Sequence, residues 1–183
     1  MRVISGSARG MKLETVTGNS LVRPTAERIK EAVFSSIQFD IEGRRILDLF
    51  AGSGQMGIEA LSRGAESAVF VDSSDVSLSV VKKNLNKTKL SDKAKTVRSD
   101  YYSFISRCNE TFDIVFLDPP YYEDILEKSL QSVSKIMSDF GIIICEHPKE
   151  LRLDDNVNDF SVYRRYDYGK ISITVYKKGG SIS

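Results

Sequence analysis

The sequence predicts an α/β domain in which a mostly parallel sheet carries helices on both faces. From residue 45 onwards, short apolar stretches alternate with stretches whose apolar residues recur at helical spacing, and this alternation is typical of parallel sheets. Four acids, Asp48, Asp72, Asp100 and Asp118, stand at or just after the ends of predicted strands. Because such folds bind ligands outside the carboxyl ends of their strands, these acids indicate where a functional site lies.

The composition is that of one soluble domain spanning residues 1–183. Hydrophobic residues make up 41% of the chain and charged residues 28%, a balance that can build a substantial core. The N-terminus lacks the apolar region of a secretory signal, and no apolar run has the length of a membrane span. We therefore expect a cytoplasmic protein with no membrane partner. Cys108 and Cys145 have no metal-binding spacing, and His147 is the only histidine, so we expect no metal site.

Charge is unevenly distributed along the chain. Residues 1–30 carry a balance of +4 and residues 161–180 again +4, whereas residues 31–160 carry −7. Basic flanks around an acidic middle predict a local contact with an anionic partner. A chance scatter of solvated charge accounts for the same numbers equally well.

The expected elements fall into an N-terminal extension, residues 1–40, and a core, residues 41–178. Residues 1–22 form a small β-unit with strands at 2–4 and 12–16, and a helix follows with a buried stripe that includes Ile29, Val33 and Ile37. Core strands are expected at 46–50, 68–72, 94–98, 112–117 and 141–145. Core helices are expected at 58–63, 76–85, 101–107 and along Leu126, Leu130, Val133 and Met137. Residues 160–166 and 170–176 pair as an antiparallel hairpin.

A glycine loop follows the first core strand. Gly52, Gly54 and Gly57 match the G-x-G-x-x-G pattern before a helix, and Asp72 lies about 20 residues further on, the distance of an acid that binds ribose hydroxyls. The pattern predicts a nucleoside close to the backbone. It leaves open whether that nucleoside belongs to a dinucleotide or to S-adenosylmethionine.

Asp48 favours S-adenosylmethionine. It lies four residues before Gly52, where a carboxylate would repel the pyrophosphate that a dinucleotide places at a helix N-terminus but would suit an ammonium group. Asp100 and Tyr101 can serve an adenine, the acid by accepting from its amine and the ring by packing on the base. The structural alternatives are that Asp48 caps the loop amides and that Asp100 is a helix N-cap.

The turn formed by Asp118, Pro119, Pro120 and Tyr121 is the candidate catalytic element. Two prolines stiffen the chain directly after a buried strand, so the turn can aim a carboxylate, backbone carbonyls and an aromatic ring at one point. A conjugated amine is a poor methyl acceptor because its lone pair is delocalised. The carboxylate of Asp118 and the carbonyl of Pro119 can accept from its hydrogens, and Tyr121 can stack on the base. We expect Asp118 to act as an ionised acceptor. A stiff loop with an aromatic plug is the structural alternative.

These motifs resemble those of a known enzyme family. The turn at residues 118–121 (DPPY) resembles the (Asp/Asn)-Pro-Pro-aromatic motif of amino-group methyltransferases, and residues 48–54 (DLFAGSG) resemble their cofactor motif. The match extends through residues 2–6, 9–10, 23–25, 58–64 and 168–169. The combination resembles the RsmD family, which methylates the N2 amine of one guanine in 16S ribosomal RNA. Gln55 and Met56 depart from the pattern, because a small residue and a leucine are expected there.

The resemblance implies a Rossmann-like class I methyltransferase fold with a mostly parallel seven-stranded sheet, helices on both faces, a C-terminal antiparallel hairpin, and a small N-terminal β-unit and helix. It implies S-adenosyl-L-methionine as cofactor and Asp118, Pro119, Pro120 and Tyr121 around the guanine. The cofactor residues that it implies are Asp48, Phe50, Ala51, Gly52, Ser53, Gly54, Met56, Asp72, Ser73, Asp100 and Tyr101.

The expected partner is 16S ribosomal RNA in the small ribosomal subunit, bound by a monomeric protein. Arg2, Arg9, Lys12 and Arg23 of the N-terminal extension could reach phosphates around a guanine flipped out of its stack. Their alternative role is solubility. The competing functions are methylation of another planar nitrogen (adenine N6 of DNA or RNA, or a protein glutamine), a nicotinamide-dependent oxidoreductase, and a non-catalytic RNA-binding module.

Overall fold

The computed structural model describes residues 1–16, 24–120 and 124–179. Its helices are α1 (Pro24–Ser36), α2 (Gln55–Ser62), α3 (Asp75–Thr88), α4 (Tyr101–Arg107) and α5 (Ile125–Val133), with short 3-10 turns η1 (Ser91–Lys93) and η2 (Ser134–Ile136). Its strands are β1 (Arg45–Asp48), β2 (Ser67–Asp72), β3 (Ala94–Arg98), β4 (Phe112–Leu117), β5 (Met137–Pro148), β6 (Asn156–Val157), β7 (Phe160–Tyr168) and β8 (Ile171–Lys178).

All these strands join one sheet in the order β3-β2-β1-β4-β5-β8-β7-β6. The pairs from β3 to β5 are parallel, and those from β5 to β6 are antiparallel. The predicted fold class is therefore confirmed, including the C-terminal hairpin of β7 and β8. The two-residue strand β6, at the edge beside β7, is additional to the seven strands expected.

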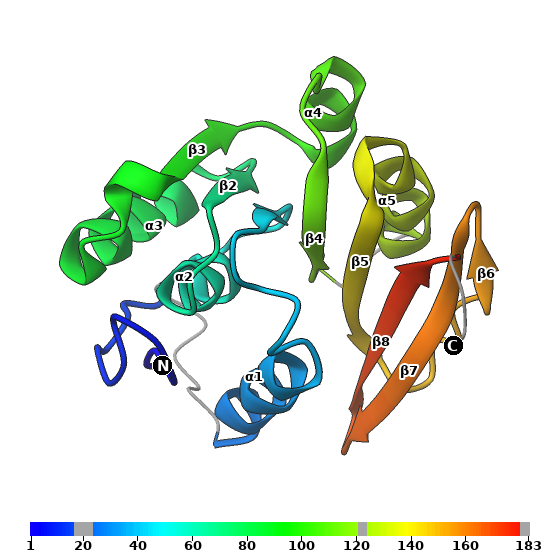
Figure 1. Ribbon diagram of the computed structural model, residues 1–183, viewed down its shortest axis with the longest axis horizontal. Helices are drawn as coiled ribbons and strands as arrows, with labels where there is room; N and C mark the ends of the chain where they lie inside the picture. The colour runs from blue at the N-terminus through cyan, green and yellow to red at the C-terminus, as the bar shows by residue number, and fades with distance from the viewer. Residues whose placement is uncertain (17–23, 121–123, 180–183) are drawn as a thin grey trace.

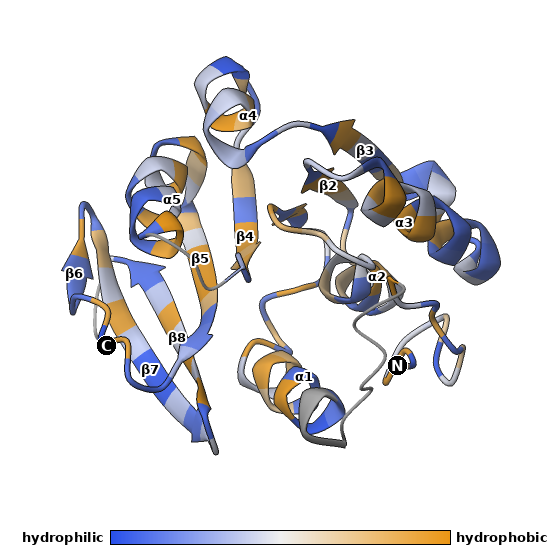
Figure 2. Cartoon of the chain, turned by 180° about the vertical axis from the view of Figure 1, so that it is seen from behind, coloured by the Kyte–Doolittle hydropathy of each residue, from blue (hydrophilic) through white to orange (hydrophobic). Residues whose placement is uncertain are grey.

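Buried side chains cover both faces of the sheet. On one face, residues of α1, α2 and α3 pack with Ile46, Phe70 and Phe116; on the other, residues of α4 and α5 pack with Val115 and Ile143. Figure 1 shows α1 and α2 on one side of β4 and β5, and α5 on the other. Figure 2 shows the hydrophobic colour running along β4 and β5, the strands that both layers cover. No helix among the described residues is long and apolar enough to span a membrane.

Two local expectations differ from the structure. The described part of the expected β-unit, residues 1–16, is a hairpin-like loop with one antiparallel bridge, between Arg2 and Lys12, rather than two strands. The expected helix through Met137 ends at Val133, because η2 turns the chain and Met137 starts β5, where it is buried. Apolar residues at helical spacing cannot reveal such a change when the next strand is also apolar.

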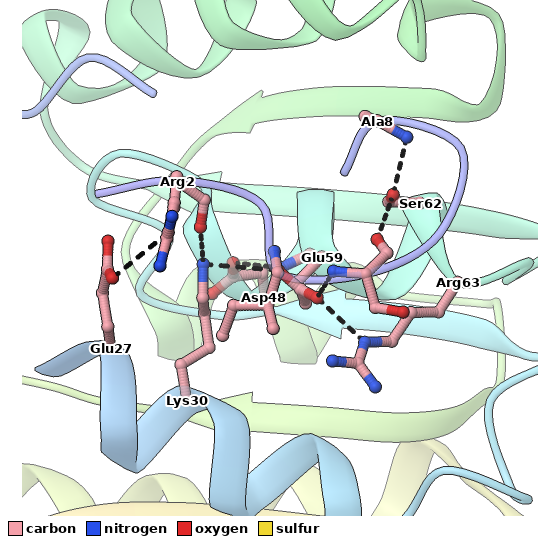
Figure 3. Close-up of polar contacts among 11 residues, drawn as sticks. Arg2, Ala8, Glu27, Lys30, Asp48, Glu59, Ser62 and Arg63 are labelled. Atoms are coloured by element: carbon pink, nitrogen blue, oxygen red, sulfur yellow. Dashed lines mark hydrogen bonds and ion pairs between the residues drawn. The ribbon is translucent and has the colours of Figure 1, made fainter. Parts of the chain in front are cut away.

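The N-terminal loop is fixed to α2 by a buried acid, Glu59 (Figure 3). Its carboxylate accepts from the backbone N–H of Ile4 at 2.8 Å and of Ser5 at 3.0 Å. The same carboxylate pairs with Lys30 of α1 at 3.3 Å and with Arg63 at 2.9 Å. Burial lowers the pKa of Lys30, and the Glu59 carboxylate opposes that effect. One side chain thus joins the loop, α1 and α2.

A close backbone approach completes this attachment. Ser62 accepts from Ala8 N–H at 2.9 Å through its hydroxyl and donates to the Ser5 carbonyl at 2.6 Å. Gly6 has φ +84°, and a Cβ there would lie 1.7 Å from the Ser62 carbonyl oxygen. Only glycine satisfies both conditions. We define residues 1–16 as the N-terminal segment.

Candidate active site

The glycine loop connects β1 to α2 and is held by two acids. Gly54, with φ +76°, turns the chain into α2. Asp48, at the end of β1, accepts from Gly57 N–H at 3.0 Å. Asp72, at the end of β2, accepts from Gly52 N–H at 2.9 Å and from the N–H of Ser74 at 2.8 Å. Hydrogen bonds from within the protein therefore fix the shape of the loop.

A cavity of about 930 Å³ lies over this loop at the carboxyl ends of the parallel strands. Every predicted cofactor residue lines it except Gly54, which lies beside Val81 and Phe70 and contributes through its left-handed backbone at the start of α2. Asp118, Pro119 and Pro120 line the same cavity. The structure thus brings the glycine loop, the strand-end acids and the first three residues of the candidate turn together, as the spacing predicts. Tyr121 lies outside the described residues.

Asp100 and two aromatic rings form the cavity wall near β3. Asp100 caps α4 by accepting from Ser103 N–H at 2.9 Å, and this hydrogen bond lowers the pKa of the carboxyl. The rings of Phe50 and Tyr101 pack with centroids 5.9 Å apart at 43°. The N-cap role of Asp100 is therefore present, and the residue still borders the cavity.

The acids in the cavity influence one another. Burial raises the pKa of Asp48 to about 7, with Asp72 adding to the effect and the Gly57 hydrogen bond opposing it. Solvent reaches Asp118 from the cavity. Enclosure by protein nevertheless raises the pKa of Asp118 well above its usual value, and the carboxylates of Glu146 and Asp48 raise it further. A positively charged ligand would favour the ionised forms of these acids.

The N-terminal segment contributes to the same cavity. Met1, Thr15 and Val16 line it. Asn84 of α3, fully buried, accepts from Glu14 N–H at 2.7 Å and donates to the Glu14 carbonyl at 3.0 Å and to the Ser53 carbonyl at 2.9 Å. One amide group therefore ties the segment to the glycine loop.

The residues predicted to bind RNA lie on the outside of this segment. Arg2, Arg9 and Lys12 are exposed and do not line the cavity. Arg2 contacts Glu27 of α1 at 3.4 Å. Arg23 lies outside the described residues. Arg2, Arg9 and Lys12 therefore stand on the segment that borders the cavity. A polyanion could contact these cations and enter the cavity at the same time.

Sequence reasoning missed several cavity residues, among them Gln55, Ser99, Phe116, Ile125 and Glu146. Glu146 could have been found, because it directly follows the stretch 141–145 that was predicted to be a strand. The rule that identified the other strand-end acids applies to it equally. The sequence gives no indication that Phe116 and Ile125 line a cavity, because apolar residues in a strand and a helix usually belong to the core.

The cavity fits S-adenosylmethionine by its own chemistry. The side-chain oxygen of Gln55, a residue in the cavity wall, is buried and has no hydrogen-bond partner among the residues that the structure describes. Such an atom suits a ligand donor such as an ammonium. Phe50 and Tyr101 offer apolar surface, and Asp48 offers negative charge to a cation. The described residues contain no group of His, Cys, Asp and Glu side chains suited to a metal ion.

Comparisons with known proteins agree with this geometry. Residues 1–177 match the family described as Conserved hypothetical protein 95. A Bacillus subtilis protein named "Putative rRNA methyltransferase YlbH" is 41% identical over 98% of this chain and 100% of its own. The Escherichia coli K12 protein named "Ribosomal RNA small subunit methyltransferase D" is 31% identical over 97% of this chain and 90% of its own. A solved structure titled "Putative methyltransferase yhhF from Escherichia coli" is 31% identical, covers 99% of both chains and superposes with a TM-score of 0.88.

Proposed function

The chain belongs to the RsmD family of ribosomal RNA methyltransferases, and from this membership we propose that it methylates the N2 amine of one guanine in 16S ribosomal RNA. One observation supports the proposal above others: Asp118 and Pro119 border the same cavity as the glycine loop. A flipped base whose amine meets the turn would therefore also meet the cofactor.

S-adenosylmethionine supplies an electrophilic methyl group on a sulfonium when it is bound. Asp48 and Gln55 would hold its methionine end, Asp72 its ribose, and Asp100 with Tyr101 its adenine. Asp72 already accepts two backbone hydrogen bonds, and carboxylate oxygens have room for further donors. The hydrogen bonds from Asp48 and Asp72 would hold the loop in one conformation, and such preorganisation would reduce the entropy lost on binding.

Asp118 and the Pro119 carbonyl would accept the two hydrogens of the guanine amine. Acceptors for both hydrogens favour a pyramidal nitrogen, whose lone pair can attack the methyl carbon. The amine loses one proton during transfer, and a carboxylate with a raised pKa is a suitable group to receive it. Asp118 must be ionised to do this, so the positive charge of the cofactor would prepare the acceptor.

Arg2, Arg9 and Lys12 would contact phosphates beside the target. Contacts of this kind fix the register of the RNA without reading its sequence. The N-terminal segment would then serve both ligands, since it carries these cations outside and Met1, Thr15 and Val16 at the cavity.

The test is methyl transfer from labelled S-adenosylmethionine to small ribosomal subunits, naked 16S ribosomal RNA and DNA, each lacking the native modification. Mass spectrometry of the digested product identifies the nucleoside and its position. We expect N2-methylguanosine at one position of the 16S RNA. Label in adenine or only in DNA would disprove the guanine-N2 proposal, and it would instead support the planar-nitrogen alternative.

A further inference from the structure

One face of the hairpin formed by β7 and β8 carries a row of tyrosines and cations. Its members are Tyr163, Arg164, Tyr166 and Tyr168 of β7 and Lys177 of β8, and we call them the hairpin strip. Tyr163 and Arg164 are exposed, and the other three are half-buried. None of the five lines the cavity. The strip is therefore a surface to which the proposed chemistry gives no role.

Strand geometry brings these side chains to one face. Alternate residues of a strand point the same way, so Arg164, Tyr166 and Tyr168 share a face of β7. The register between β7 and β8 shifts directly before Arg164, which makes Tyr163 an extra residue in a bulge. A bulge re-aims a side chain. The centroid of the Tyr163 ring lies 4.4 Å from the Lys177 ammonium and 5.3 Å from the Arg164 guanidinium.

The strip carries positive charge. Within residues 1–16, 24–120 and 124–179, no carboxylate forms an ion pair with Arg164. Lys177 contacts Asp40 at 3.4 Å in a partly exposed pair. Asp167 lies in the same stretch of β7, but it points to the other face and pairs with Lys149 at 3.0 Å. The strip therefore accounts for part of the +4 balance of residues 161–180.

The strip lies close to the cavity. Glu146, which lines the cavity, pairs with Ile173 of β8, and Ile173 pairs with Tyr166 of β7. Neighbouring strands are about 4.8 Å apart, so Tyr166 stands about 10 Å from Glu146 along this row. Ile173 belongs to the same buried layer as the cavity residue Phe116, and Tyr166 packs against that layer. The strip therefore lies on the face of the sheet to which Phe116 also belongs.

The N-terminal segment lies on the opposite side of the cavity. In the sheet, β5, β8 and β7 follow β4 on one side, whereas β1, β2 and β3 lie on the other. Asn84 of α3 ties Glu14 of the segment to the glycine loop after β1, and buried residues of the segment pack in the same layer as Ile173. Figure 1 shows the segment and the hairpin on opposite sides of the molecule. The two basic flanks of the sequence therefore border the cavity from both sides.

Exposed tyrosines beside cations suit single-stranded RNA, because the rings can stack on bases while the cations contact phosphates. Tyrosine and arginine are also common in protein interfaces. The position of the strip favours RNA. A flipped guanine leaves its neighbouring nucleotides outside the cavity, and these must follow the surface that borders it.

We propose that the hairpin strip binds the RNA strand on one side of the target guanine, while the cations of the N-terminal segment contact the other side. Tyr163 stacks on a base, and Arg164 and Lys177 contact phosphates. The proposal rests on the proposed function, because it describes the path of the RNA whose guanine enters the cavity. The strip contributes affinity rather than sequence selection, since stacking and phosphate contacts tolerate any base.

The test measures binding of naked 16S ribosomal RNA and of small subunits, each lacking the native modification, at several salt concentrations and with excess transfer RNA as competitor. Tyr163→Ala should weaken binding by about 5- to 100-fold, the range for one stacked base, whereas Tyr163→Phe keeps the ring and should stay within about twofold of the wild type. Arg164→Ala should weaken binding and reduce the steepness of log affinity against log salt by about 0.7, the value for one lost phosphate contact.

Arg107→Ala is the matched control and should change neither affinity nor salt dependence. Arg107 is an exposed arginine at the end of α4, which packs on the other face of the sheet. Calorimetry should show wild-type affinity for S-adenosylmethionine in every variant, which establishes that the variants are folded.

Unchanged RNA affinity in Tyr163→Ala and Arg164→Ala would overturn the proposal, as would equal losses in Tyr163→Ala and Tyr163→Phe. Weaker binding confined to assembled subunits would identify a ribosomal protein as the occupant and would also overturn it. The proposed function fails separately. RNA binding that depends on the strip, without guanine methylation by the wild-type protein, would refute that function, whereas guanine methylation with unaffected RNA binding would refute only the role of the strip.

Discussion

Replacing Asp48 by asparagine should stabilise the ligand-free protein while weakening cofactor binding. Asparagine keeps an oxygen that can accept from Gly57 N–H, which Asp48 does at 3.0 Å. It removes a charge that the fold holds at 4% exposure. The change therefore separates the structural contact of Asp48 from its electrostatic role.

The size of the effect follows from the pKa. Burial raises the pKa of Asp48 from 3.8 to about 7, and each unit corresponds to about 1.4 kcal/mol, so ionising Asp48 costs the folded state about 4 kcal/mol. The unfolded chain ionises above 3.8 and the folded chain only above about 7. The loss of folding stability caused by Asp48 is therefore absent below pH 3.8, grows between pH 3.8 and about 7, and is complete above that pH. Because the new amide N–H groups need partners of their own, we expect a net gain of about 2 kcal/mol at pH 8.

The assay is denaturant unfolding of both proteins at pH 5 and pH 8, with and without S-adenosylmethionine. The stability difference should be larger at pH 8, where thermal unfolding should shift upwards by about 4–8 °C. The cofactor should stabilise the variant much less than the wild type. Asp92→Asn, at an exposed acid, is the control and should leave stability almost unchanged. A variant less stable at pH 8, or an equal difference at both pH values, would refute this reasoning.

Four further results are expected. Asp118→Ala should reduce methyl transfer by at least about 100-fold while calorimetry still detects S-adenosylmethionine binding, and near-normal transfer would rule out the acceptor role. The pH profile of kcat/KM should rise through neutrality, because the pKa of Asp48 is about 7 and that of Asp118 is raised; a flat profile from pH 5.5 to 8.5 would contradict this. Glu59→Gln leaves Lys30 buried without its counter-charge and should cost about 3 kcal/mol in denaturant unfolding, whereas Glu110→Gln in an exposed pair should change little. Asn84→Ala removes the hydrogen bonds to Glu14 and Ser53 and should weaken cofactor binding measured by calorimetry; unchanged affinity would show that the glycine loop does not depend on Asn84.

The strands and the glycine loop could be predicted because their determinants are local. The apolar stretch 112–117 coincides with β4, and Asp100 ahead of residues 101–107 marks the start of α4. The site followed from them, since parallel strands bring their carboxyl ends to one edge. The strand-end acids Asp48, Asp72, Asp100 and Asp118, which are far apart in the sequence, therefore line one cavity as expected.

Other features depend on contacts that no local pattern contains. The N-terminal segment takes its form from Glu59, which lies more than fifty positions along the chain from Ile4 and Ser5. Glu59 sits in an ordinary helical stretch, so nothing in its neighbours marks it as a buried anchor. The length of β5 also differs from the expectation: the predicted strand ends at residue 145, whereas β5 continues to Pro148 because it pairs with β8 along its whole second half.

The attachment of the N-terminal segment to Glu59 has a consequence for how the chain acquires its structure during synthesis. The segment is translated before its anchor on α2, which emerges from the ribosome only after a further stretch of more than forty residues. Val3, Ala8 and Leu13, which end in the core, must remain unprotected until then. Folding of the N-terminal segment thus lags behind its synthesis, and the delay is set by the position of one glutamate.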